Sequence, residues 1–347
     1  MSRVYLDYNA TAPLRAEARA AMIRAMDVVG NPSSVHGEGR AAKGLIERAR
    51  GQVASALGAD GADVIFTSGA TEAAALACAG RGLHGAAVEH DAVKAWITAD
   101  LPVDSNGHVT VSDPAQSVLQ LANSETGVIQ DLPEGLAMSD MTQGFGKLPL
   151  AFNWSGCEMA IVSSHKLGGP KGVGALVVKR GTEVAARIKG GGQEMGRRSG
   201  TENVIGIAGF GAAAEAAMRD LSDGVWARTA EFRKILEKVI ADGAKETIFV
   251  GKDSARLPNT LCMITPGWKG ETQVMAMDLA GFAVSSGSAC SSGKVRASGT
   301  LEAMGFTPED AACALRVSLG PETSKDEVMR FGEAWLKQWT KHRARAA

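Results

Sequence analysis

One of the five cysteines has surroundings that suit a nucleophilic thiol. Cys290 lies in the run Val284–Lys294, whose many serine and glycine residues are typical of an exposed loop. Lys294 and Arg296 would favour the thiolate, the form of cysteine that attacks electrophiles. Three others, Cys78, Cys262 and Cys313, lie in apolar segments and are expected in the core. The sequence leaves open whether Cys157 is buried. No C-x-x-C pair indicates a disulfide framework or a zinc site.

Lys166 is a candidate for imine formation with an aldehyde. It follows the apolar run Met159–Val162, which predicts a buried strand, and it lies among Ser, His and Gly residues. An amine that attacks a carbonyl must first lose its proton, and the surroundings of a lysine can promote this. The alternative is a surface lysine in a glycine-rich turn, which this setting favours less.

The segment Thr67–Glu72 could bind an anion. It joins a predicted buried strand, Val64–Thr67, to an alanine-rich helix that is expected to begin at Thr71. The free N–H groups and the dipole of a helix N-terminus attract phosphate groups. An ordinary helix start with Thr71 as its cap remains the other interpretation.

Three further side chains could complete such a site. Asp140, at the end of Leu136–Ser139, could keep a pyridine nitrogen protonated. His90 follows a predicted strand and could stack on a planar ring and transfer protons. Arg316 lies in the apolar run Leu315–Gly320, so a buried anion such as a substrate carboxylate is expected beside it.

Strands separated by helices predict a mostly parallel α/β sheet, with these residues at the carboxyl ends of its strands. Strands are expected at 64–67, 86–88, 118–121, 159–162 and 174–178, and helices at 202–220 and 226–242. Short strands at 248–250 and 261–264 and helices near 271–280 and 325–341 predict a second, smaller α+β domain. We therefore expect a large domain at 14–243 and a small domain made of 1–13 and 244–347.

Composition excludes several classes of partner. The chain has 347 residues, a net charge of −1 and 45% apolar residues, as expected of a globular protein of two domains. The charge balance indicates neither nucleic acid nor membrane as a bulk partner. No apolar run reaches the ~20 residues of a membrane span, and the N-terminus lacks the apolar core of a signal peptide. A cytoplasmic location is expected.

Taken together, the motifs resemble those of the NifS/IscS cysteine desulfurases, which are fold-type I enzymes of the class-V aminotransferase family. The resemblance extends from Tyr5 to about residue 335, and its specificity comes from the order of many short motifs. They are Tyr5–Pro13, Gly30–His36, Thr67–Glu72, Glu89–His90, Ser163–Lys166, Gly190–Glu194, Arg198–Thr201, Ser285–Cys290 and Arg316–Gly320. It implies a seven-stranded, mostly parallel sheet in the large domain.

The resemblance implies pyridoxal phosphate as the cofactor. Lys166 would hold its aldehyde, Asp140 its pyridine nitrogen and Gln143 its ring hydroxyl, while His90 would stack on the ring. The phosphate would be bound by Ala70, Thr71, Ser163 and His165, together with the partner subunit's Thr201 in a homodimer.

The resemblance also assigns the substrate L-cysteine and the acceptor of its sulfur. Arg316, with Asn31 and Ser124, would bind the substrate, and Ser124 would also lie at the cofactor. Cys290 would take the sulfur as a persulfide, with His90 handling the thiol proton. An acceptor such as an iron–sulfur scaffold protein is implied, and Cys290 would then contact a cluster during transfer. The resemblance implies no resident metal site, no membrane and no nucleic acid as a partner.

The chain departs from the family pattern in three ways. It has Asn123-Ser124-Glu125 where the family usually has Asn-Asn-Glu, and the shorter serine can lose a contact with the ring hydroxyl or the substrate. Several connections are compressed, and the one between Gln130 and Asp140 leaves no room for the usual helix. The C-terminus ends early, in a region where family members meet partner proteins.

Three alternatives stay open. A selenocysteine lyase would use the same residues. A class-V aminotransferase would not need a thiol at Cys290. A catalytically weak, cofactor-binding scaffold protein is suggested by Ser124 and the shortened segments, although Lys166, Asp140 and Arg316 argue against it.

Overall fold

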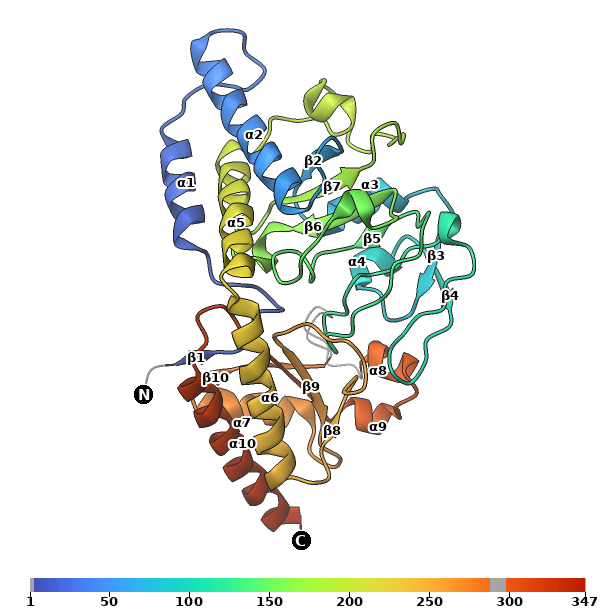
Figure 1. The fold of residues 1–347 in the computed structure, drawn as a ribbon, viewed down its shortest axis with the longest axis vertical. Helices are drawn as coiled ribbons and strands as arrows, with labels where there is room; N and C mark the ends of the chain where they lie inside the picture. The colour runs from blue at the N-terminus through green and yellow to red at the C-terminus, as the bar shows by residue number, and fades with distance from the viewer. Residues whose placement is uncertain (1–2, 288–297, 347) are drawn as a thin grey trace.

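The computed structural model describes residues 3–287 and 298–346 (Figure 1). Cys290, Lys294 and Arg296 lie outside these residues, so the expectations for them stay predictions. Within the described chain, no helix combines the length and the apolar character needed to cross a membrane.

A mixed sheet occupies the centre of the larger part of the molecule. Its strand order is β2 (Asp63–Thr67), β7 (Gly174–Val178), β6 (Met159–Ser163) and β5 (Ser139–Asp140). β7 is antiparallel to both of its neighbours, whereas β5 and β6 are parallel.

A parallel pair, β3 (His84–Ala86) and β4 (Thr98–Leu101), continues the sheet only through single parallel bridges. These bridges join Val118 to Met138 and Ser117 to His84. The described chain thus has a four-stranded and a two-stranded sheet in place of the single seven-stranded sheet that the resemblance implies.

Alternate residues of β2 pack on opposite faces of this sheet, as the twofold period of a strand requires. Val64 and Phe66 join the core under the helices α1 (Ala16–Met26), α2 (Gly37–Ala56) and α5 (Val204–Ser222). Ile65 faces the other core, under α3 (Ala70–Cys78) and α4 (Asp91–Lys94). Figure 1 shows these two groups of helices on either side of the sheet.

The second part of the molecule contains an antiparallel sheet. Its order is β11 (Ser285–Ser286), β12 (Ala314–Ser318), β9 (Thr260–Ile264) and β8 (Ile248–Phe249). The helices α6 (Val225–Gly243), α7 (Gly270–Leu279) and α10 (Lys325–Ala346) accompany it, and α8 (Gly299–Ala303) and α9 (Pro308–Ala311) lie near β8 (Figure 1). α6 contributes Leu236 and Ile240 to this core, and the domain boundaries given above stay a prediction.

The N-terminal segment connects the two parts. β1 (Val4–Tyr5) pairs in parallel with β10 (Phe282–Ala283), and Asp7 bridges to Ser318. The chain then passes under the central sheet, where the backbone N–H of Ala12 donates to the carbonyl of His165.

The secondary structure departs from the expectations in three places. The strand expected at 86–88 is β3, two residues earlier, and its chain turns at 87–89. The run 118–121 forms single bridges instead of a strand, because its N–H groups bond in turn to β3 and to the segment ending in β5. The helix expected to start at Thr71 begins at Ala70, with Gly69 in the N-cap position. The connection 131–138 contains no helix, as its length predicted.

Candidate active site

A cavity of about 600 Å³ lies where β5 and β6 end and α3 begins. Most of the residues predicted to hold a cofactor line this one cavity. They are Ala70, Thr71, His90, Ser124, Asp140, Gln143, Ser163, His165 and Lys166. The structure therefore brings together side chains from motifs separated by almost a hundred residues.

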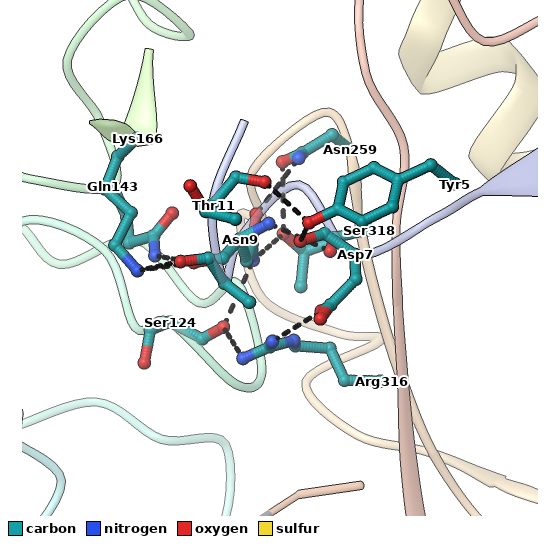
Figure 2. A network of polar contacts seen from close by, with 12 residues as sticks. Tyr5, Asp7, Asn9, Thr11, Ser124, Gln143, Lys166, Asn259, Arg316 and Ser318 are labelled. Carbon is teal, nitrogen blue, oxygen red and sulfur yellow. Dashed lines mark hydrogen bonds and ion pairs between the residues drawn. The ribbon is translucent and has the colours of Figure 1, made fainter. Parts of the chain in front are cut away.

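Lys166 is held at the floor of this cavity by the N-terminal segment. A short 3-10 turn, Ser164–Lys166, follows β6 directly. The Lys166 Nζ donates to the carbonyl oxygens of Asn9 and Ala10, each at 2.8 Å. Figure 2 shows Lys166 beside Asn9 and Gln143. The amine is thus placed by backbone groups, whose positions depend on the fold alone.

Asp140 provides the carboxylate of the cavity. It ends β5, and its Oδ1 accepts a hydrogen bond of 2.9 Å from the Thr142 N–H. Glu89 lies behind it, buried, with its Oε1 accepting from the Gln120 N–H at 2.7 Å. Burial, with a smaller contribution from Asp140, raises the pKa of Glu89 to about 8. Glu89 is therefore protonated at neutral pH and adds no second negative charge beside Asp140.

Both histidines of the cavity are fixed by hydrogen bonds. His90 caps α4, and its Nδ1 accepts from the Ala92 N–H at 3.1 Å, so its Nε2 is the protonated nitrogen of the neutral ring. The Nδ1 of His165 lies 3.2 Å from the Thr11 hydroxyl. Burial, together with the positive charges of Lys166 and Lys171, lowers the pKa of His165 to about 4, so His165 is neutral.

The first turn of α3 is suited to an anion. Gly69 provides no side-chain cap, and Ser68, Gly69, Ala70 and Thr71 all line the cavity. The N-terminal N–H groups of a helix need acceptors, and the helix dipole makes an anion a good one. The sequence left a helix start capped by Thr71 open, but the N-cap residue is Gly69, which makes no side-chain cap. The Glu72 carboxylate accepts from the Ser68 N–H, one residue earlier.

Arg316 forms an ion pair within the chain, with the partly buried Asp7. The guanidinium is fully buried on β12, and its Nη2 donates to Asp7 Oδ1 at 2.8 Å. Its Nη1 donates to the carbonyl oxygen of Ser124 at 3.2 Å, as Figure 2 shows. Arg316 itself does not line the cavity, but Ser124 does, so the backbone of Ser124 connects the arginine to the cavity wall.

Two predicted residues lie away from the cavity of their own chain. Asn31 is exposed, and its Oδ1 accepts from the Ser33 N–H at 2.9 Å in a local turn. Thr201 is also exposed, three residues after Arg198, which pairs with Glu72 at 2.8 Å. Their assigned roles stay predictions.

The four cysteines of the described residues are buried. Burial raises the pKa of Cys78 and Cys262 to about 12 and that of Cys157 to about 11, and it raises the pKa of Cys313 as well. These thiols are protonated at neutral pH, which confirms the core positions expected for three of them and resolves that of Cys157.

Sequence reasoning missed several residues of this site. Asp7 and Asn9 belong to the motif Tyr5–Pro13, but the sequence indicates no role for either side chain. For Glu89 it indicates only a position next to His90. Lys147, which is buried near Gln143, gave no signal at all, because Gly146-Lys147 reads as an ordinary turn.

Comparisons with known proteins agree with this geometry. Residues 4–331 match the family model described as aminotransferase class-V. The chain is 38% identical to a cysteine desulfurase of Frankia sp. (strain EuIK1), over 94% of this chain and 88% of that protein. Its fold is similar to that of a NifS-like protein from Rickettsia africae, with a TM-score of 0.87, 31% identity and coverage of 97% and 99%.

A further solved structure, entitled "SspA in complex with cysteine", has a TM-score of 0.75 and 27% identity to this chain. The structural alignment covers 92% of this chain and 100% of the SspA chain. Given the near-complete coverage and the shared fold, this chain belongs to the class-V aminotransferase family, among its cysteine desulfurases.

Proposed function

We propose that the protein is a pyridoxal-phosphate enzyme that converts L-cysteine to L-alanine and carries the sulfur as a persulfide on Cys290. The observation that carries the proposal is the single cavity that joins Lys166, Asp140 and His90 to the uncapped start of α3. Relatives named cysteine desulfurase and the cysteine complex of a similar fold support cysteine as the substrate.

The cavity fits pyridoxal phosphate. Lys166 would hold the aldehyde carbon and Asp140 the ring nitrogen, with His90 against one face of the ring. The N–H groups at the start of α3 would bind the phosphate, together with Ser163 and His165, and a neutral His165 can donate one hydrogen bond there. When bound, this cofactor supplies an electron sink for the α-carbon of an amino acid.

Different residues of the chain would carry out the proton transfers and the sulfur transfer. The Nζ of Lys166, once it has lost its proton, takes the proton from the substrate Cα, and the carbonyls of Asn9 and Ala10 orient it. The Nε2–H of His90 would donate to the substrate sulfur, because Nδ1 is occupied by the Ala92 N–H. The Cys290 thiolate attacks the substrate sulfur: an S–S bond forms, the substrate Cβ–S bond breaks, and its electron pair goes to Cβ, which takes a proton.

Substrate binding and assembly complete the proposal. Arg316, Asn31 and Ser124 would bind the substrate carboxylate. The Arg316 guanidinium would then contact both this carboxylate and Asp7. A homodimer would bring the partner subunit's Thr201 to the phosphate. The sulfur would pass, in the cytoplasm, to an acceptor such as an iron–sulfur scaffold protein or to a related thiolation.

The experiment measures cofactor, alanine and sulfide with purified protein. We expect absorbance at ~420 nm from the bound cofactor. With dithiothreitol present to reduce the Cys290 persulfide, we expect alanine and sulfide to be released from cysteine in equal amounts. Lys166→Ala should lose the absorbance, while Lys179→Ala, at an exposed lysine, should keep it. Cys290→Ser should keep the absorbance and lose the persulfide, whereas Cys313→Ser, in the core, should lose neither.

Different outcomes identify the alternatives. Transamination of cysteine without sulfide would indicate an aminotransferase, and a strong preference for selenocysteine would indicate a lyase for that substrate. Bound cofactor without turnover of either amino acid would indicate a scaffold protein.

A further inference from the structure

Lys147 is a buried lysine for which the proposed chemistry has no role. Its side chain is almost completely inaccessible, with 3% relative exposure. It follows Gly146, whose φ of 74° and close approach to Ala217 and Leu167 leave little room for a side chain. Among residues 3–287 and 298–346, no carboxylate forms an ion pair with Lys147. A buried ammonium without a counter-ion is costly, so its retention needs an explanation.

The hydrogen bonds of Lys147 lead directly to the candidate site. Its Nζ donates to Gln143 Oε1 at 2.6 Å and lies 3.4 Å from Asn9 Oδ1. The Gln143 Nε2 in turn donates to the Asn9 carbonyl at 3.0 Å, and the same carbonyl accepts from Lys166. Figure 2 shows Gln143, Asn9 and Lys166 converging in this way.

An ammonium group can only donate hydrogen bonds, whereas an amide has a donor end and an acceptor end. Lys147 in its charged form is therefore compatible with only one orientation of the Gln143 side-chain amide. The amide oxygen must face Lys147, and the amide N–H groups must face the Asn9 carbonyl and the cavity that Gln143 lines.

We propose that Lys147 is a positioning residue, which fixes the Gln143 amide with its donors toward the cavity and, through Asn9, holds the carbonyl on which Lys166 rests. The inference rests on the proposed function, because it treats Gln143 as a donor to the ring hydroxyl of the cofactor. Lys147 itself contacts neither cofactor nor substrate.

The charge of Lys147 makes this arrangement sensitive to pH. Burial, with smaller contributions from the positive charges of Lys166 and Arg316, lowers the pKa of Lys147 to about 7. Below this pH the ammonium imposes one amide orientation. Above it, the neutral amine gains a lone pair and can also accept from the Gln143 amide, so the orientation is no longer forced.

The other titratable groups around the network bear on its pH dependence. On the side of the cavity these are His90, Asp140, His165 and Lys171. On the other side, a smaller cavity of about 100 Å³ brings Tyr8, Arg15 and Glu322 near Lys147 and Lys166. The pair of Asp7 and Arg316 lies beyond Asn9. Because all of these remain in a Lys147 variant, a pH effect that disappears with Lys147 belongs to it.

The first test uses the apoprotein and needs no cofactor. The side-chain amide of Gln143 is followed by NMR from pH 6 to 8.5 and assigned by its loss in Gln143→Ala. We expect its resonances to titrate with a midpoint near pH 7, and to stop titrating in Lys147→Met. Lys238→Met, at a lysine with 78% side-chain exposure, is the matched control. An amide that does not titrate, or titrates equally in Lys147→Met, overturns the proposal.

The second test is a double-mutant cycle on cofactor affinity, measured by titrating the apoprotein with pyridoxal phosphate. At pH 6, Lys147→Met should raise the Kd roughly 5- to 30-fold, as expected for one buried hydrogen bond. The increase should be smaller at pH 8.5 and absent in the Gln143→Ala background. An equal increase with and without Gln143 would mean that Lys147 only supports the fold, and would overturn the positioning role.

Two further outcomes separate the inference from the proposed function. If the wild type does not bind pyridoxal phosphate while its Gln143 amide titrates with Lys147, the proposed function fails and the positioning role stands. If Lys147→Met does not fold, Lys147→Gln takes its place: it keeps a donor without the charge, and the titration near pH 7 should again be lost.

Discussion

The Arg316 guanidinium donates to the Asp7 carboxylate across 309 residues of sequence, at 2.8 Å, with the arginine side chain completely buried. The last strand of the second sheet is thereby tied to the seventh residue of the chain. The same arginine reaches the carbonyl of Ser124, so one cation joins three distant segments beside the cavity.

Removing the charge of Asp7 should destabilise the protein. Asp7→Asn leaves the buried Arg316 without its anion, and we expect a loss of about 2–4 kcal/mol in the free energy of unfolding. Denaturant unfolding measures it. The matched control is Asp278→Asn, which removes the same charge from a pair with Arg3 that is more than half exposed and should cost less than about 1 kcal/mol. Equal costs at the two sites would contradict the assignment.

Glu89 should make stability fall as pH rises. An unfolded glutamate has a pKa of about 4.3, whereas burial raises that of Glu89 to about 8. Between these values the unfolded chain releases its proton and the folded protein keeps it, so the folded state loses stability with increasing pH.

Glu89→Gln should remove this dependence. We expect its melting temperature to exceed that of the wild type by a margin that grows between about pH 5 and 8. Glu231→Gln, at an exposed residue of α6, should follow the wild type throughout. A margin that is constant with pH would show that Glu89 is ionised in the folded protein.

Ser124→Asn should increase desulfurase activity. Asn9 and Arg316 both donate to the backbone carbonyl of Ser124, so the substitution leaves these contacts in place while adding an amide at greater reach. One hydrogen bond regained in the transition state corresponds to roughly 5- to 150-fold in kcat/KM. Alanine production at matched cofactor occupancy measures it, with Ser105→Asn on the surface as the control. Equal kinetic constants would make the serine a neutral replacement.

A homodimer with shared sites should show complementation between inactive variants. Lys166→Ala and Thr201→Ala would each impair every site of their own dimers. In a mixed dimer both defects fall on one site and leave the other intact, so refolding equal amounts together should recover roughly a quarter of the wild-type activity. Mixtures no more active than the separate variants would indicate that Thr201 serves no neighbouring site.

Local patterns in the sequence predicted the long elements well. The apolar runs at 159–162 and 174–178 became β6 and β7, and the helices at 202–220 and 226–242 became α5 and α6 with ends shifted by one or two residues. Their periodicity and length are sufficient because each buries its own apolar face. The run 118–121 has the same composition, but its neighbours hold it by single bridges only.

The site was predictable where a short motif carries the chemistry, as at Lys166 and Asp140. Asn9 was not predictable, because its contacts with Lys147 and Lys166 span more than a hundred residues. Lys147 bonds to Gln143 only four residues away, but nothing in the sequence indicates that its amine is buried. Arg316 was predictable only in part. Its apolar surroundings predicted an anion beside it, but nothing nearby in the sequence indicated that Asp7 provides this anion.

The path of the N-terminal segment also constrains how the protein can be made. Residues 4–9 are synthesised long before their partners, which are β10, Thr260 and Ser318. Contacts of such long sequence separation form late in folding. Nearly the whole chain must therefore be synthesised before Asn9 can reach its place, and until then Lys166 lacks the carbonyls that hold it. We expect nascent chains that end before β12 to be unable to retain a ligand at this cavity.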